Sequence, residues 1–74
     1  MTLSDKIKAL MTLKGKKTHE LAERFDVTPQ SMRNKMSRNT YSAADLIEIV
    51  DFLGAKLVIE VDDNVKIVIT KDDV

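Results

Sequence analysis

The stretch KTHELAERFDVTPQSMRNKMSR, residues 17–38, decides the fold because it predicts two short helices joined by a tight turn. The first helix is expected over about Lys17 to Phe25, where Leu21, Ala22 and Phe25 recur at helical spacing. These three residues form a narrow apolar stripe, and charged residues occupy the other side. A second and more polar helix follows after the turn.

The second helix is expected over about Pro29 to Arg38. Thr28 is a good N-cap, and Pro29 fits the first helical position, where its missing N–H costs nothing. Met32 and Met36 are four residues apart and face inward. The outer faces are left with polar side chains, which are Gln30, Ser31, Arg33, Asn34 and Ser37. Arg, Gln and Asn can make bidentate contacts to purine edges in the major groove of DNA.

This stretch resembles the helix-turn-helix of the lambda-repressor and Cro superfamily, the xenobiotic-response-element type of transcriptional regulator. The resemblance lies in its apolar residues and its turn, which are Leu21-Ala22, Phe25-Asp26-Val27-Thr28 and Met32. Flanking helices extend the likeness over about residues 3–54. The sequence departs from the family at Asp26, where the turn usually has a glycine with positive φ, and Asp tolerates that conformation better than most residues. It departs again at Lys35, a position that is often apolar.

The resemblance implies a set of DNA contacts. Arg33 is expected to be the main base contact, to guanine, within the set Gln30, Ser31, Arg33, Asn34 and Ser37. The DNA backbone would be held by flanking residues, which are Lys17, Thr18, His19, Lys35, Arg38, Asn39 and Thr40. Each of these residues also has a simpler explanation. The lysines can serve only to keep the protein soluble, and polar loop residues usually have no role beyond forming the loop. A lone histidine such as His19 is far more often a surface residue than a catalytic one.

Two further helices are expected on either side of this stretch. The first should begin near Thr2 or Ser4 and run to about Leu13, with Gly15 ending it. The last has Ser42 as N-cap, with Asp45 completing a capping box, and Gly54 at its C-terminal side. The apolar residues of this last helix cover more than half its circumference, so we expect a second element or subunit to cover them.

The segment KLVIEVDDNVKIVIT, residues 56–70, changes to a period of two and predicts a β-hairpin that turns at Asp62-Asp63-Asn64. We prefer a three-residue loop with Asn64 in the left-handed conformation, because a two-residue loop would mix the two faces. The three-residue loop pairs Leu57 with Ile69, Ile59 with Ile67 and Val61 with Val65 on one face, and Val58 with Val68 and Glu60 with Lys66 on the other.

A lone hairpin is marginal in water, so this one needs partners. One face can pack on the last helix. The other, comprising Val58, Glu60, Lys66 and Val68, could pair with a second subunit in a four-stranded sheet. Cro-like repressors dimerise through C-terminal strands, so the resemblance implies a homodimer as well. The alternative is a monomer whose hairpin folds over its own helices.

Composition sets the broad class. The chain has 74 residues and no cysteine, no apolar run reaches the length of a membrane span, and the N-terminus does not resemble a signal peptide. We therefore expect a cytoplasmic protein. Residues 1–41 contain nine Lys and Arg against four Asp and Glu, whereas residues 42–74 contain three against eight. A basic half that carries the polar helix fits a phosphate-facing surface, although a solvated surface with incidental asymmetry is the simpler alternative.

The sequence thus predicts a single domain, mainly α with a C-terminal β-hairpin: a four-helix DNA-binding bundle over residues 1–54, a hairpin over residues 55–70 and a tail over residues 71–74. Its expected function is that of a homodimeric repressor binding double-stranded DNA at a palindromic operator, as in a phage or mobile-element switch. No enzyme activity, metal, cofactor or small-molecule ligand is expected. The alternative is a protein-interaction module, anti-repressor or antitoxin-like, on the same scaffold; an RNA binder lacks exposed aromatic residues.

Overall fold

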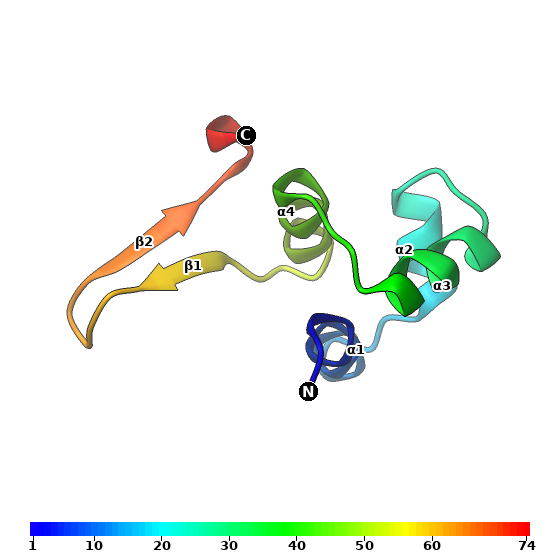
Figure 1. Ribbon diagram of the computed structural model, residues 1–74, viewed down its shortest axis with the longest axis horizontal. Coiled ribbons are helices and arrows are strands. Elements are labelled where there is room, and N and C mark those ends of the chain that lie inside the picture. The colour runs from blue at the N-terminus through cyan, green and yellow to red at the C-terminus, as the bar shows by residue number, and fades with distance from the viewer. The chain divides into compact units, whose positions relative to one another are not determined.

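The computed structural model describes residues 1–74 and has helices first and strands last, as the sequence predicts (Figure 1). The protein is mainly helical, with one small antiparallel hairpin at the C-terminus. None of its helices combines the length and the hydrophobicity needed to cross a membrane. The elements in chain order are α1 (Leu3–Leu13), α2 (Thr18–Arg24), α3 (Pro29–Arg38), α4 (Ala43–Phe52), β1 (Leu57–Glu60), β2 (Lys66–Ile69) and a final 3₁₀ turn (Lys71–Asp73).

The chain divides into two compact units, residues 1–41 and residues 42–74. The N-terminal unit holds α1, α2 and α3, and the C-terminal unit holds α4 and the hairpin. The sequence analysis grouped α4 with the three preceding helices, whereas the contacts within the chain group it with the strands. This places the polar helix α3 and the predicted dimer strands in different units.

Capping residues explain where the helices of the N-terminal unit begin. The Thr2 hydroxyl accepts a hydrogen bond from the Asp5 N–H at 3.1 Å, and the Asp5 carboxylate accepts one from the Thr2 N–H, also at 3.1 Å. Thr28 caps α3 by accepting the Ser31 N–H at 3.1 Å, and Pro29 follows it in the first turn. Between α2 and α3, Asp26 has a φ of 56°, which confirms the left-handed conformation expected there.

The core of the N-terminal unit lies between its three helices. Leu21 and Ala22 of α2 are completely buried, and Met32 and Met36 of α3 are 1% and 4% exposed. The inward orientation predicted for both methionines is therefore confirmed. α1 contributes Ile7 and Met11. Burying a large apolar side chain contributes about 1.5–3 kcal/mol, so these few residues supply much of the hydrophobic stabilisation of the unit.

The C-terminal unit begins with the predicted capping box. The Ser42 hydroxyl accepts the Asp45 N–H at 3.0 Å, and the Asp45 carboxylate accepts the Ser42 N–H at 2.9 Å. Three apolar residues of this helical segment are buried, namely Ile47, Ile49 and Leu53.

The hairpin has the predicted register, with Leu57 opposite Ile69, Val58 opposite Val68, Ile59 opposite Ile67 and Glu60 opposite Lys66. The Val61 N–H donates to the Val65 carbonyl at 2.9 Å, which also confirms a three-residue loop. The prediction of a left-handed Asn64 is wrong, because Asp26 and Asn39 are the only non-glycine residues with positive φ. Instead, the Asp62 carboxylate accepts the N–H groups of Asn64 and Val65, at 2.8 and 3.0 Å, and closes the loop without that conformation.

Candidate nucleic-acid interface

The exposed face of α3 carries a chain of hydrogen bonds between side chains. The Arg33 guanidinium donates to the Gln30 amide oxygen at 3.3 Å, and the Gln30 amide nitrogen donates to the Asn34 amide oxygen at 3.0 Å. The three residues are three and four positions apart, which places neighbouring side chains on the same helical surface. All three are exposed. The structure therefore brings together the three predicted base contacts whose side-chain types can bind purine edges.

These hydrogen bonds leave most of the N–H donors of Arg33 and Asn34 available. Arg33 has five N–H donors and uses one here, and the amide N–H groups of Asn34 remain outside these bonds. Bidentate recognition of guanine needs two N–H donors from one side chain, held in a plane, whereas that of adenine needs one N–H donor and one oxygen acceptor from a side-chain amide. The arrangement can present Arg33 to guanine and Asn34 to adenine without any group having to leave a buried site.

The two serines among the predicted base contacts lie in different settings. The hydroxyl of Ser31 accepts a hydrogen bond from the Thr28 hydroxyl at 3.0 Å, so Ser31 belongs to the cap of α3 as well as to its surface. Ser37 lies at the other end of the helix and lines a pocket of about 260 Å³ together with Thr18 and Arg33. The structure thus joins Ser37 to one residue predicted for the bases and one predicted for the backbone.

Met36 of α3 and Lys8 of α1 complete the lining of this pocket, and the sequence analysis missed Lys8. It also lines a second pocket of about 260 Å³, with Met11, Thr12, Lys16, Lys17 and Thr18. We call Lys8, Lys16, Lys17 and Thr18 the basic surface. The signal for Lys8 was present in the sequence, because it lies three and four residues from the buried Met11 and Ser4 and so borders the buried face of α1.

The charges of the basic surface are of one sign. Its three lysines are exposed, Thr18 is half-buried, and neither pocket has an acidic residue in its lining. Lysine ammonium groups and hydroxyls are common ligands of DNA phosphates. Because these groups are exposed, their attraction for an anion is expected to fall as salt is added.

The other residues predicted for the DNA backbone are more scattered. His19 is exposed and lines neither pocket, and Lys35 is half-buried. The Thr40 hydroxyl donates to the Arg38 carbonyl at 3.1 Å. Asn39 has a φ of 54°, and its side-chain oxygen accepts the Ser4 N–H at 2.9 Å. The oxygen of Asn39 is therefore engaged inside the unit, which sequence reasoning did not anticipate.

Both faces of the hairpin are exposed. The predicted dimer face, Val58, Glu60, Lys66 and Val68, lies on one side as the register requires. On the opposite face only Leu57 and Ile69, at the base of the hairpin, are half-buried. The remaining apolar residues of that face, which we call the distal patch, are Ile59, Val61, Val65 and Ile67, with exposed fractions of 46–62%. The hairpin therefore offers more uncovered apolar surface than the sequence analysis assigned to a partner.

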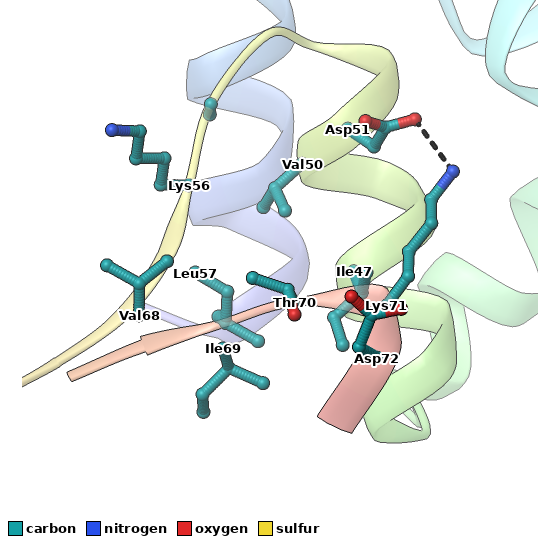
Figure 2. A pocket seen from close by; sticks show the side chains of 11 residues that line it. Ile47, Val50, Asp51, Lys56, Leu57, Val68, Ile69, Thr70, Lys71 and Asp72 are labelled. Atoms are coloured by element: carbon teal, nitrogen blue, oxygen red, sulfur yellow. Dashed lines mark ion pairs between the residues drawn. The ribbon is translucent and has the colours of Figure 1, made fainter. Parts of the chain in front are cut away.

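A pocket of the C-terminal unit lies between α4 and the base of the hairpin (Figure 2). It measures about 470 Å³, and Ile47 and Val50 of α4 line it together with Leu57 and Ile69 of the strands. Lys71 forms an ion pair with Asp51 across a distance of 3.1 Å, drawn as a dashed line in Figure 2. The pocket is open and mainly apolar.

No group of histidine, cysteine and acidic residues in the chain is arranged to hold a metal ion. Comparisons of the chain with protein-family models, with curated proteins and with solved structures give no match.

Proposed function

We propose that this protein is a sequence-specific regulator of transcription that binds double-stranded DNA as a homodimer in the cytoplasm. The observation that carries the proposal is the hydrogen-bonded chain of Arg33, Gln30 and Asn34 on the exposed face of α3. These are the side-chain types that recognise purine edges, and they occupy one face of a helix whose opposite face is buried. The resemblance of residues 17–38 to a helix-turn-helix supports the same proposal.

In the proposed complex, α3 enters the major groove. Arg33 contacts guanine through its two parallel N–H groups, and Gln30 and Asn34 contact neighbouring bases. Lysines of the basic surface hold the phosphates and fix the position of the helix along the duplex. Two copies related by a two-fold axis would place their α3 helices in successive major grooves, about 34 Å apart, so the operator would be a palindrome.

The charge of the N-terminal unit supports this assignment. Residues 1–41 carry nine basic and four acidic side chains, a net charge of about +5, whereas residues 42–74 carry about −5. A uniformly neutral chain would have no preferred orientation toward a polyanion. The separation of charge favours approach to DNA by the unit that contains α3.

The test is selection of bound duplexes from a random DNA library, at about 0.15 M salt so that non-specific phosphate binding is reduced. The expected result is an enriched palindrome. The matched control is the variant with Gln30, Arg33 and Asn34 all changed to Ala; these residues are exposed, so the fold should be retained while the enrichment disappears. A folded wild-type protein that enriches no sequence would contradict the proposal.

A second candidate function is a protein-interaction module, and the observation that favours it is the uncovered hairpin. Six apolar residues of the hairpin, Val58, Val68 and the four of the distal patch, have exposed fractions of 38–62%. So many exposed apolar side chains on one short hairpin are typical of an interaction surface. This function needs neither Arg33 nor its neighbours. A regulatory activity that survives the triple alanine variant would favour it over DNA recognition.

A further inference from the structure

Ser4 is the only polar residue among the buried residues of this protein, with an exposed fraction of 4%. It lies in the first turn of α1, and three hydrogen bonds connect it to the end of α3 and the segment that follows. Its N–H donates to the Asn39 side-chain oxygen at 2.9 Å, and its hydroxyl contacts the Met36 carbonyl and the Tyr41 hydroxyl, both at 2.5 Å. A buried polar side chain with a complete set of partners fixes the groups around it.

The direction of each bond follows from the chemistry of the groups. A carbonyl can only accept, so the single proton of the Ser4 hydroxyl goes to the Met36 carbonyl. The Tyr41 hydroxyl must then donate to Ser4. Because the Ser4 N–H needs an acceptor, the side-chain amide of Asn39 must turn its oxygen toward α1.

The two helices therefore cap each other. The N–H groups in the first turn of a helix and the carbonyls in its last turn have no partner within the helix. Asn39 supplies an acceptor for one such N–H of α1, and Ser4 supplies a donor for one such carbonyl of α3. We call this pair of bonds the reciprocal cap.

Asn39 is suited to this position for two reasons. It ends α3 in the left-handed conformation, with a φ of 54° and a ψ of 39°, which asparagine adopts more readily than most residues. Its backbone N–H also donates to the Met36 carbonyl at 3.1 Å, the same carbonyl that Ser4 reaches. Glycine would satisfy the backbone equally well but has no side chain to reach α1.

We propose that Ser4 and Asn39 are positioning residues, which hold the C-terminal end of α3 against α1 and thereby set the sequence specificity of the DNA contact. This inference rests on the proposed function. Arg33, Asn34 and Ser37 lie within six residues of Asn39, so a change in the direction of the helix end moves the atoms that would contact bases. Phosphate contacts tolerate such a movement because lysine side chains are long and flexible.

The test compares specific with non-specific affinity, measured as the ratio of binding to the selected operator and to random duplex. Asn39→Gly keeps the left-handed backbone and removes the acceptor, and Ser4→Ala removes the donor. Each should lower the ratio about tenfold, equivalent to about 1.4 kcal/mol. Asn39→Asp keeps a side-chain oxygen that can accept the Ser4 N–H, so its affinity ratio should stay within about twofold of the wild-type ratio, a difference of less than 1.4 kcal/mol.

The matched control is Thr2→Ala, which removes the side-chain cap of α1 without touching α3. It should lower the melting temperature while leaving the affinity ratio unchanged. If Thr2→Ala lowers the ratio as far as Asn39→Gly does, the effect comes from stability alone and the positioning role is overturned. Equal losses on operator and random duplex for Asn39→Gly also overturn it, because that is the signature of a backbone contact.

Amide hydrogen exchange supplies a measurement that needs no variant. In the wild type, the Ser4 amide should exchange more slowly than that of Leu3, which precedes it in α1. Equal exchange of the two amides would overturn the reciprocal cap itself. A wild type that binds all duplexes equally would overturn the proposed function, whereas a normal wild-type preference with unchanged ratios in folded variants would overturn the positioning role alone.

Discussion

The outer face of α3 and the two faces of the hairpin are both open to solvent, but they differ in chemistry. On α3, the polar side chains of Arg33, Gln30 and Asn34 satisfy one another and can also bond to water. On the hairpin, the distal patch exposes four apolar side chains that gain nothing from water. A polar face can stay open at no cost, whereas apolar surface is stabilised by about 25 cal/mol for each Å² that a partner covers. The two surfaces therefore suit different partners, a polyanion for the first and an apolar surface for the second.

The largest effect is expected at the hairpin. Val68→Lys on the predicted dimer face should convert the proposed dimer to a monomer, and the loss of the second half-site should reduce operator affinity by about 10²–10⁴-fold. Val68 is 46% exposed, so the lysine can be accommodated without disturbing the core. Sedimentation equilibrium measures the first change, and titration with the selected duplex measures the second.

Ile67→Lys is the control for this prediction, because Ile67 belongs to the distal patch on the other side of the strand. If Ile67→Lys dissociates the dimer and Val68→Lys does not, the interface is the distal patch. If the wild type and both variants are monomeric at every concentration, the hairpin does not bind a second copy of the chain, and the dimer prediction is wrong.

A comparable effect, on stability, is expected in the N-terminal core. Leu21→Ala should reduce the free energy of unfolding by about 2–5 kcal/mol, because Leu21 is completely buried and its truncation leaves a cavity in the core. Val61→Ala in the hairpin should change it by no more than about 0.5 kcal/mol, because Val61 is 62% exposed. Urea unfolding at low protein concentration measures both. Similar losses for the two variants would mean that the hairpin is covered in solution.

Local signals were sufficient for the helices, the hairpin register and the exposed face of α3. Thr28 with Pro29, Ser42 with Asp45, and the alternation of Val and Ile each act within a few residues, so the sequence displays them directly. The reciprocal cap was not predictable in this way, because it joins residues 35 positions apart. Ser4 shares a helical face with Ile7 and Met11, but serine is usually exposed, so its type gave no sign that it is buried.

Asn64 shows a different limit. Asparagine in a tight loop is a good candidate for the left-handed conformation, and the prediction followed that preference. The Asp62 side chain, two residues earlier, binds the loop N–H groups and favours another backbone path. Two residues with similar turn chemistry competed, and their intrinsic preferences do not say which prevails. Lys8 was missed for a third reason: its place beside the buried face of α1 follows from helical spacing, but the pocket that it shares with α2 and α3 has no signature in α1 alone.

A smaller effect is expected on the face of α3. Arg33→Ala should cost about 1–3 kcal/mol of specific binding and relax one operator position, because a bidentate contact discriminates between bases. Lys8→Ala and Lys17→Ala should instead weaken binding to all sequences alike and reduce the salt dependence by about one phosphate contact each. Competition binding at several salt concentrations separates the two patterns. An equal loss on operator and random duplex for Arg33→Ala would remove it from the base contacts.

The smallest effect concerns the pH dependence of the N-terminal unit. The Thr2 N–H donates to the Asp5 carboxylate, and this bond, helped by the Thr2 hydroxyl and the Lys8 charge, holds the pKa of Asp5 below its ordinary value. A carboxyl whose pKa is lower in the folded state stabilises the protein above its ordinary pKa, and that contribution is lost as the pH falls through the folded value. The free energy of unfolding of the wild type should therefore fall as the pH drops from the ordinary pKa of aspartate through the lower pKa of folded Asp5. The Asp5→Asn variant should show a flatter dependence of stability on pH. Asp5 is fully exposed, so the change should be small. NMR titration of the Asp5 carboxyl measures the direction of the pKa shift independently. A pKa at or above the ordinary aspartate value would show that the capping box does not lower it.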